Sequence, residues 1–365
     1  MMKPVFPETE SCATQELSNV LRLCSLLRVL AILLLLITGC ASVTEREKPV
    51  VKLFWPPPPQ EPRIEYMHTI SSPSDIGISK TWLGRLADSL FGSEEVEDIF
   101  VLPHGVFCSD TDRLLVTDTG SASVHILDLK NREYINFNKT GSDEALVSPI
   151  GITEDSDGNI YVSDSVLNKI FVFDKQGGYI SRFGDNLKRP TGLAIDNNSK
   201  LIFVADTLGS KIIVYDLKGK ELYSFGKSGN SEDEFNFPTH IFFGGDGLLY
   251  VSDTLNFRVQ AFDKNGGFRF MFGKAGDGSG DMSKPKGVAT DSEGHIYVVD
   301  SVFETVQIFG KDGRLLLAFG SSGSGPGNLN IPSGIFIDKK DNIYIVDSFN
   351  KRVQVFRFLR QREKS

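Results

Sequence analysis

Residues 331–356 read IPSGIFIDKKDNIYIVDSFNKRVQVF, and this pattern decides the fold because the chain repeats it. Close copies upstream read KPKGVATDSEGHIYVVDSVFETVQIF, FPTHIFFGGDGLLYVSDTLNFRVQAF, RPTGLAIDNNSKLIFVADTLGSKIIVY and SPIGITEDSDGNIYVSDSVLNKIFVF. The most divergent copy reads LPHGVFCSDTDRLLVTDTGSASVHIL. A repeat of this length is one supersecondary unit that cannot bury its own apolar face, so successive copies must pack against one another.

An aspartate ends the second apolar run of every copy, and successive aspartates are 42 to 47 residues apart. These repeated aspartates are Asp118, Asp164, Asp206, Asp253, Asp300 and Asp347. Short runs of β-branched and aromatic residues between Gly, Asn and Asp are typical of strands. Four strands at such a period predict one propeller blade per copy. The sequence therefore predicts an all-β, six-bladed β-propeller with its repeats over residues 100–358.

The repeated pattern P-x-G-[IV]-x-x-D…[IL]-Y-V-x-D-[ST]-x-N-x-R-[VI]-Q-x-F resembles the NHL repeat. This resemblance covers about residues 100–358 and implies a six-bladed β-propeller of NHL type. The first copy departs most from the pattern, with Asp112 and Arg113 where a turn glycine is expected. The fourth copy carries His240 in place of the opening glycine.

The last copy supplies only three strands before a charged tail at residues 359–365. An unpaired edge would be a site for aggregation, so a strand from elsewhere should close the blade. Residues 62–70 alternate as a strand and are predicted to pair with the last copy, which places the propeller at 62–358. Residues 78–91 have the spacing of a short amphipathic helix, which docks on a propeller face or contacts a membrane or partner.

Residues 1–39 have the features of a lipoprotein signal peptide, with a charged start and an apolar run at 29–37 that is too short to span a bilayer. The residues that follow resemble a bacterial lipobox ending at Cys40, which implies lipidation of that cysteine. A plain signal peptide and a membrane helix are the alternatives. The interpretation predicts export to the bacterial cell envelope and a lipid anchor in the membrane, on the outer-membrane or periplasmic side.

Residues 40–61 are predicted to be a lipidated tether and a Pro-rich spacer, unless Phe54 and Trp55 pack on the propeller rim. Cys12 and Cys24 would leave with the leader, so Cys108 would be the remaining free thiol and could form no internal disulfide. A cysteine in a strand is most often a small buried hydrophobe. The formal net charge is −8 and no block of Lys and Arg occurs, so no nucleic-acid binding is expected.

The loops that enter the first strand and leave the second strand of each blade should share one face, at the mouth of the central channel. The middle residues of the Pro-x-Gly motifs are expected there, as a binding surface that varies from blade to blade. They are His104, Ile150, Thr191, Thr239, Lys286 and Ser333. The same surface is expected to include His240, Phe257, Phe303, Phe349, Arg258 and Arg352, although the three aromatics could instead fill gaps between blades.

The repeated aspartates are interpreted as structural residues, because six identical copies cannot all form an active site. Asp side chains hydrogen-bond to nearby backbone N–H groups and so favour tight turns. A basic residue follows five positions after four of them and is expected to pair with its aspartate. These residues are Lys169, Lys211, Arg258 and Arg352.

No catalytic residue is predicted. Related propellers include an amidating lyase with a zinc site and lactone hydrolases with a central calcium. A zinc site needs about three convergent imidazoles, but only His104 and His240 lie at the mouth. They belong to opposite blades and are one residue out of phase, so their side chains are expected to face differently. The segment from Asp277 to Asp281 is short of ligands for calcium.

The predicted function is therefore that of a monomeric, non-catalytic scaffold or recognition module with no cofactor, which binds an envelope protein or polysaccharide through one propeller face. The alternative is a metal-dependent lyase or lactonase with zinc or calcium at the channel mouth. A third possibility is a sensor or assembly factor for envelope polysaccharide.

Overall fold

The computed structural model describes residues 25, 28, 52–78, 98–141 and 144–360. The chain divides into two compact units, Met1–Val50 and Val51–Ser365, and the second unit contains the propeller. Cys40 with the lipobox-like residues, and nearly all of the helix expected at 78–91, lie outside the described residues. Among the described residues, no helix is long and apolar enough to cross a membrane.

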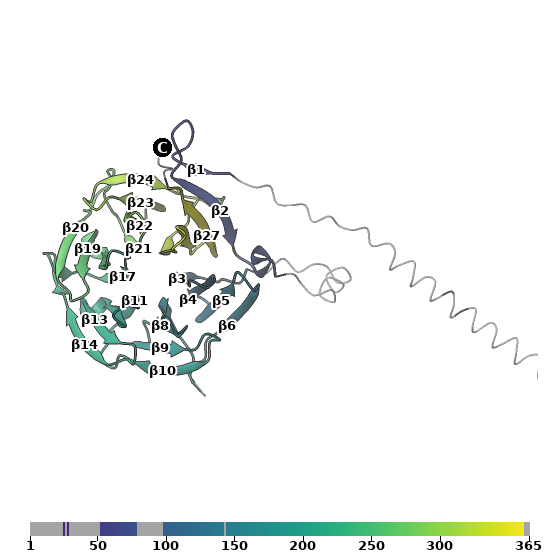
Figure 1. Cartoon of the computed structure of the whole chain (residues 1–365), viewed down its shortest axis with the longest axis horizontal. Helices are drawn as coiled ribbons and strands as arrows, with labels where there is room; N and C mark the ends of the chain where they lie inside the picture. The colour runs from purple at the N-terminus through teal and green to yellow at the C-terminus, as the bar shows by residue number, and fades with distance from the viewer. Residues whose placement is uncertain (1–24, 26–27, 29–51, 79–97, 142–143, 361–365) are drawn as a thin grey trace, which may run out of the picture. The chain divides into compact units, whose positions relative to one another are not determined.

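Within the described part of residues 64–358, the strands form six antiparallel sheets arranged as the blades of a ring, together with one short parallel pair, which confirms the predicted fold class (Figure 1). Blade 1 consists of β3 (Pro103–Cys108), β4 (Arg113–Asp118), β5 (Ser123–Asp128) and β6 (Glu133–Phe137). Blade 2 consists of β7 (Pro149–Glu154), β8 (Ile160–Asp164), β9 (Lys169–Phe173) and β10 (Tyr179–Phe183). Blade 3 consists of β11 (Pro190–Asp196), β12 (Leu201–Asp206), β13 (Lys211–Asp216) and β14 (Glu221–Phe225).

The second half of the ring follows the same order from the centre outward. Blade 4 consists of β17 (Pro238–Phe243), β18 (Leu248–Asp253), β19 (Arg258–Asp263) and β20 (Phe268–Phe272). Blade 5 consists of β21 (Pro285–Thr290), β22 (Ile296–Asp300), β23 (Thr305–Phe309) and β24 (Leu315–Phe319). Blade 6 contains β25 (Pro332–Ile337), β26 (Asn342–Asp347) and β27 (Arg352–Phe358). The short elements are η1 (Pro73–Ile76), β15 (Lys227–Ser228), β16 (Glu234–Phe235), η2 (Thr207–Gly209) and η3 (Thr254–Asn256).

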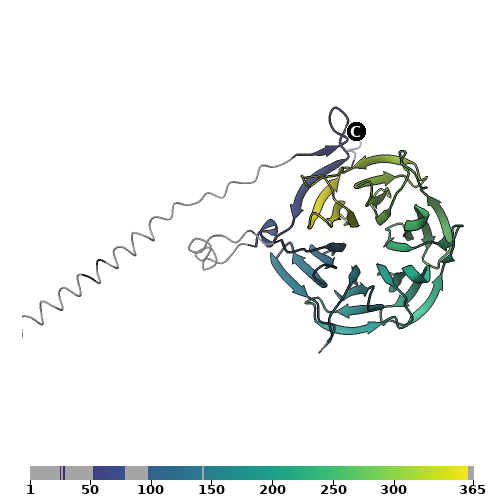
Figure 2. The same cartoon turned by 180° about the vertical axis from the view of Figure 1, so that it is seen from behind.

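An N-terminal strand closes blade 6, as the alternation of residues 62–70 predicted. Strand β2 (Ile64–Ile70) pairs antiparallel with β27, with Ile64 opposite Phe358 and Ile70 opposite Val353. Figure 2 shows this strand beside the last blade from behind. Because β2 comes from the other end of the chain, it closes the ring and leaves no bare edge on β27.

The propeller begins before residue 62, because β1 (Phe54–Trp55) adds a fifth strand to blade 6. The ring centroid of Trp55 lies 5.8 Å from that of Phe356 and 5.9 Å from that of Phe319. The prolines at 56–59 therefore lie in the loop of a hairpin between β1 and β2. They do not form the extended stand-off that their composition suggested, because Trp55 packs against Phe319 and Phe356 of the blades.

The core consists of six apolar clusters, each lying between two adjacent blades. The second and third strands of each blade are buried on both faces, which explains their nearly continuous apolar sequence. Each blade thus depends on its neighbours for burial, and the ring gains stability only as a whole. The arrangement fixes the loops at both ends of the strands on a rigid frame.

Candidate functional site

The loops after the second strand of each blade lie on one face of the ring, together with the loops that enter the first strands. We call this the aspartate face. Its post-aspartate loops are 119–122, 165–168, 207–210, 254–257, 301–304 and 348–351. In blade 1, Asp118 accepts hydrogen bonds from the backbone N–H of Val101 at 2.6 Å and of Gly120 at 2.8 Å. One carboxylate therefore ties the two loops of its blade together.

All six repeated aspartates are completely buried, and those of blades 2 and 5 make the same two kinds of contact as Asp118. Asp164 accepts from Val147 and Leu167, and Asp300 accepts from Ser283 and Phe303. Burial acts to raise the pKa of Asp118, but hydrogen bonds from His125 and backbone N–H groups outweigh it and hold the pKa below its usual value. These are the contacts of structural carboxylates that fix the loops. Among the six aspartates, Oδ2 of Asp206 is the one carboxylate oxygen found buried without a hydrogen-bond partner in the described part of the chain.

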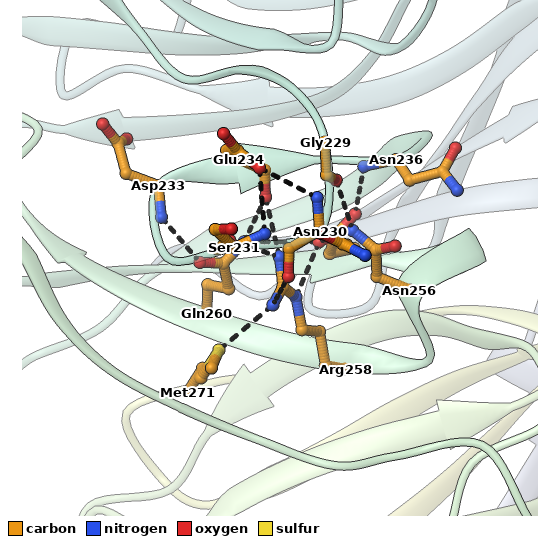
Figure 3. A network of polar contacts seen from close by, with 11 residues as sticks. Gly229, Asn230, Ser231, Asp233, Glu234, Asn236, Asn256, Arg258, Gln260 and Met271 are labelled. Atoms are coloured by element: carbon orange, nitrogen blue, oxygen red, sulfur yellow. Dashed lines mark hydrogen bonds and ion pairs between the residues drawn. The ribbon is translucent and has the colours of Figure 1, made fainter.

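Arg258 belongs to a buried network below this face and is not part of a free binding surface, which corrects the sequence-based assignment (Figure 3). Its Nε donates to Asp253 at 2.9 Å, and its other nitrogens donate to the carbonyls of Asn230, Ser231 and Glu234 at 2.8 Å each. The guanidinium thus clamps the loop that leads into blade 4. A fork of several donors suits Arg to this role.

Arg352 makes the same clamp in blade 6. Its Nε donates to Asp347 at 2.7 Å, and its remaining nitrogens bind the carbonyls of Ser324, Gly325 and Asn328. The expected pairing therefore holds for both arginines. Lys169 forms an ion pair with Asp185, which lies in the loop to blade 3, instead of with its own repeated aspartate.

The hydroxyl residues of the Pro-x-Gly motifs join adjacent blades. Thr191 Oγ1 donates to the carbonyl of Thr239 at 2.8 Å, and Ser333 Oγ donates to the carbonyl of His104 at 2.8 Å. Both side chains are buried. The mouth residues Thr191 and Ser333 thus hold the innermost strands together, and the expected variable binding surface does not include their hydroxyls.

The glycine of the Pro-x-Gly motif permits this close approach. A Cβ on Gly151 would lie 2.2 Å from the carbonyl oxygen of Thr191, and one on Gly105 would lie 2.3 Å from that of Ile150. Blade 4 carries His240 at the equivalent position. Its side chain therefore adds bulk where the other blades have none.

The imidazole rings of His104 and His240 stack across the centre of the propeller. Their centroids lie 5.3 Å apart and their planes are inclined by 16°. The expectation that these side chains face differently was wrong. The alternation rule fails because β3 and β17 each have an irregular register between the Pro-x-Gly segment and the rest of the strand.

The charge of Lys286 on β21 also affects the pKa values of these two imidazoles. Burial, and to a smaller extent the charge of Lys284, lower the pKa of Lys286 to about 8. Burial and the charge of Lys286 lower the pKa of His104 to about 3. Burial, His104 and Lys286 lower the pKa of His240 as well. Two neutral imidazoles and an ammonium group therefore meet at the centre, and we call them the central basic cluster.

Aromatic side chains from the first strands of blades 1, 4 and 6 also contact one another. The ring centroid of Phe336 lies 4.6 Å from that of Phe107 and 6.1 Å from that of Phe242. Within the described residues, no group of three or more His, Cys, Asp or Glu side chains is placed to hold a metal ion. His125 instead contacts Asp118 and Tyr134 inside blade 1, and His295 contacts Asp291 on the opposite face.

Of the three aromatics expected on the aspartate face, Phe349 is exposed, whereas Phe257 packs against the cluster between blades 4 and 5. Phe303 is half-buried. Phe257 is turned inward because its backbone adopts a left-handed conformation at φ 55° where η3 ends. Thus the aromatics do not form a common patch.

A different set of apolar side chains does form a ring on this face. The residue two positions after the repeated aspartate is exposed in blades 2 to 6, with fractional exposures between 46% and 58%. These residues are Val166, Leu208, Leu255, Val302 and Phe349. The sequence held the signal, because Asp-[ST]-[VLF] recurs in five copies.

In blade 1, different residues supply the apolar surface on this face. Gly120 occupies the equivalent position, and a Cβ there would lie 2.7 Å from the side chain of Val101. Val101 and Leu102 are themselves exposed and occupy the space that a side chain at 120 would fill. Each blade therefore presents apolar surface at the same height on the aspartate face.

An open pocket of about 430 Å³ lies on the opposite face, between blades 3 and 4. Its lining includes Asp196, Phe243 and Arg269. Arg269 is already engaged by Asp263 at 2.7 Å. This pocket adds no cluster of unpaired chemical groups.

Cys108 is buried at the end of β3. Burial raises the pKa of its thiol to about 12. A thiol that stays protonated is neither a nucleophile nor a good metal ligand. The residue therefore serves as a small core side chain.

Comparison with known proteins agrees with the architecture. The model of a family described as 6-bladed beta-propeller matches residues 108–228 and 287–361, more than half of the chain. The chain is 27% identical over 111 residues to Protein brain tumor of Drosophila melanogaster, a match that spans 29% of this chain and 11% of that protein.

Several solved structures share the fold. Virginiamycin B lyase from Staphylococcus aureus has a TM-score of 0.53 at 17% identity, covering 71% of this chain and 95% of that chain. An auxiliary nutrient binding protein from Bacteroides ovatus has a TM-score of 0.55 at 15% identity, covering 72% of this chain and 70% of that chain. Likeness at such identities shows the fold alone, and function must be argued from the site.

Proposed function

The chain belongs to the 6-bladed beta-propeller family, and on that premise we propose that it is a non-catalytic scaffold that binds a protein partner through the aspartate face. The observation that carries this proposal is the ring of exposed apolar side chains at Val166, Leu208, Leu255, Val302 and Phe349. Exposed apolar side chains that gather on one face are a feature of interaction sites. Side chains repeated at one height around a rigid ring suit a broad contact with a protein.

The supporting frame is pre-organised. The buried aspartates and the clamps of Arg258 and Arg352 hold the loops that present the ring, so binding would order few further groups. Low ordering cost favours affinity. Polysaccharide binding would instead need exposed polar groups, and the hydroxyls of Thr191 and Ser333 are engaged between blades.

We also propose that the repeats are of NHL type and that the chain is exported and lipidated at Cys40, which would hold the scaffold at a bacterial envelope membrane. The NHL assignment draws on the Asp-x-x-Asn-x-Arg-x-Gln motif, which builds the same network in blades 4 and 6. Lipidation is tested by labelling the wild type and Cys40→Ala with a fatty-acid probe in the expressing bacterium. Equal labelling of both would remove the anchor from the proposal.

The metal-dependent lyase or lactonase is the second candidate, because His104 and His240 meet at the centre. Two imidazoles are fewer than the three ligands of a typical zinc site, and an ammonium beside them opposes a cation. The binding scaffold is therefore the stronger proposal.

The experiment replaces the apolar ring in the full chain with polar residues: Val166→Thr, Leu208→Gln, Leu255→Gln, Val302→Thr and Phe349→Gln. In-cell crosslinking and mass spectrometry should find a specific protein partner with the wild type and lose it with the variant. The matched control replaces exposed apolar residues on outer strands, Ile180→Thr, Leu222→Gln and Leu316→Gln. Partner capture that both variants keep, or that both lose, would contradict the assigned face.

A further inference from the structure

Two ring nitrogens at the centre of the propeller lack hydrogen-bond partners. Nδ1 of His104 and Nε2 of His240 are buried and unpaired within the described residues. Buried polar atoms in native proteins nearly always have a partner, so each exception calls for an explanation. Both residues are half-buried as a whole, whereas the two nitrogens themselves are buried.

Neighbouring hydroxyls determine the tautomer of His240. Thr254 Oγ1 donates its proton to the carbonyl of Pro285 at 2.9 Å, so it can only accept from Thr239, whose oxygen lies 2.6 Å away. Thr239 has then used its own proton and accepts from Nδ1 of His240 at 3.2 Å. A neutral imidazole carries one N–H. Nε2 of His240 therefore presents a lone pair.

His104 also presents an unprotonated ring nitrogen, but its tautomer is set by a different hydrogen bond. It hydrogen-bonds to the backbone of Ile150, and its Nδ1 is unpaired, so Nε2 is the nitrogen that donates. Nδ1 of His104 is then the unprotonated nitrogen. Both free positions in the central basic cluster are acceptors.

Lys286 supplies a positive charge that no carboxylate balances. No acidic group among the described residues acts on it, and the charged group that does is Lys284. The charges that act on the two histidines come from the cluster itself, from His104 and Lys286. A buried cation without a partner is unfavourable. The electrostatic potential at this point is therefore positive.

We propose that the central basic cluster is a binding site for an oxyanion that carries two protons of its own, with dihydrogenphosphate as the simplest example. The O–H groups of the ligand would donate to Nδ1 of His104 and Nε2 of His240, and its negative oxygens would face Lys286. Such a ligand satisfies every unpaired group with one molecule.

Other occupants satisfy only part of the cluster. Water could donate to both imidazoles but would leave the ammonium unbalanced. Sulfate would balance the ammonium, but it has no proton at neutral pH to donate to the imidazoles. A zinc ion would accept the two lone pairs but would be repelled by Lys286. These differences make the identity of the ligand testable.

The affinity should fall as pH rises. Lys286 has a pKa of about 8 and loses its charge above that pH. Dihydrogenphosphate also loses one of its two donor protons as the pH rises. The cluster consists of His104, His240 and Lys286, and the exposed Lys284 acts on it only through its charge. All four groups are basic. None of them opposes this trend.

Isothermal titration calorimetry on the full chain in detergent tests the site with inorganic phosphate, sulfate and zinc. Phosphate should bind, and sulfate should bind at least about tenfold more weakly. Lys286→Met and His240→Gly should each weaken phosphate binding at least about tenfold, while Lys284→Met, an exposed lysine on the same blade, should change it less than about threefold. His240→Gly restores the residue found in the other blades, so it is expected to fold.

Sulfate binding as tight as phosphate binding would overturn the role of the lone pairs. Zinc binding lost in His240→Gly but kept in Lys286→Met would replace the oxyanion with a metal, and absence of phosphate binding to the folded wild type would end the proposal. The polar variants of the apolar ring should keep phosphate binding. This separates failure of the central site from failure of the aspartate face.

Discussion

His104 and His240 stack at the centre of the ring with 5.3 Å between centroids, although they come from blades on opposite sides. The contact joins blades 1 and 4 directly and brings two buried imidazoles beside Lys286. Its energetic consequence is acid sensitivity. A buried imidazole that cannot take up a proton favours the unfolded chain as pH falls.

We expect His104 to make the protein less stable below pH 6.5, the ordinary value for histidine. The pKa of His104 falls from 6.5 in the unfolded chain to about 3 in the folded protein, so the unfolded chain binds more protons between these values. Stability then declines with falling pH by up to about 1.4 kcal/mol per pH unit. His104→Gln should show a shallower decline in thermal unfolding midpoint from pH 6.5 to about pH 5.

His295 offers a control of opposite sign. Its hydrogen bond to Asp291 raises its pKa, so its contribution is fully present below the ordinary pKa and is lost as pH rises through the raised value. His295→Gln should therefore flatten the pH dependence above pH 6.5 and leave the acid limb unchanged. An acid limb that is equally steep in His104→Gln and the wild type would contradict the first prediction.

Removing the guanidinium from either buried clamp should be costly. Arg258→Ala and Arg352→Ala each leave a buried aspartate and several loop carbonyls without their donor, which typically costs about 3–5 kcal/mol. Chemical denaturation is the measurement. Arg269→Ala breaks an ion pair whose arginine side chain is 54% exposed, and it should cost no more than about 1 kcal/mol. Equal effects in the two classes would show that the clamps are not structural.

A methyl group at the blade junction should destabilise the ring. Gly151→Ala places a Cβ 2.2 Å from the carbonyl oxygen of Thr191, which forces the innermost strands apart. Overpacking of this kind costs about 1–3 kcal/mol or more. Gly245→Ala is the matched control, because no atom lies within 4 Å of its Cβ position. Thermal unfolding of both variants should show a lowered midpoint only for Gly151→Ala.

The closing strand should contribute as a core element. Ile64 and Ile70 are completely buried against blade 6 and its neighbours, so Ile64→Ala and Ile70→Ala should each cost about 2–5 kcal/mol. His68 is exposed on the same strand, and His68→Ala should change the unfolding midpoint little. Small effects at both isoleucines would mean that the strand merely lies on the blade.

Cys108 should resist alkylation in the native protein. It is buried and burial raises the pKa of its thiol to about 12, so little thiolate exists at neutral pH. Iodoacetamide should label the peptide that contains Cys108 only after denaturation, as measured by mass spectrometry. Rapid native labelling would show that blade 1 opens.

Only part of the candidate site could be predicted from the sequence. The Asp-Arg pairing could be predicted because both residues lie in one repeat, five positions apart. The exposed ring at Val166 and its equivalents was missed, although it follows a local pattern. Exposure depends on whether the neighbouring loop covers a side chain, as the contrast between Phe257 and Phe349 shows.

The sequence by itself determined the number of blades, their order and the strand that closes them, because each follows from a local period and from the need to pair a last edge. Only the tertiary structure decided what lies at the centre. The meeting of His104, His240 and Lys286 depends on ring closure, on irregular strand register and on three distant blades. No local pattern encodes such a juxtaposition, since the residues are brought together by packing of the whole ring.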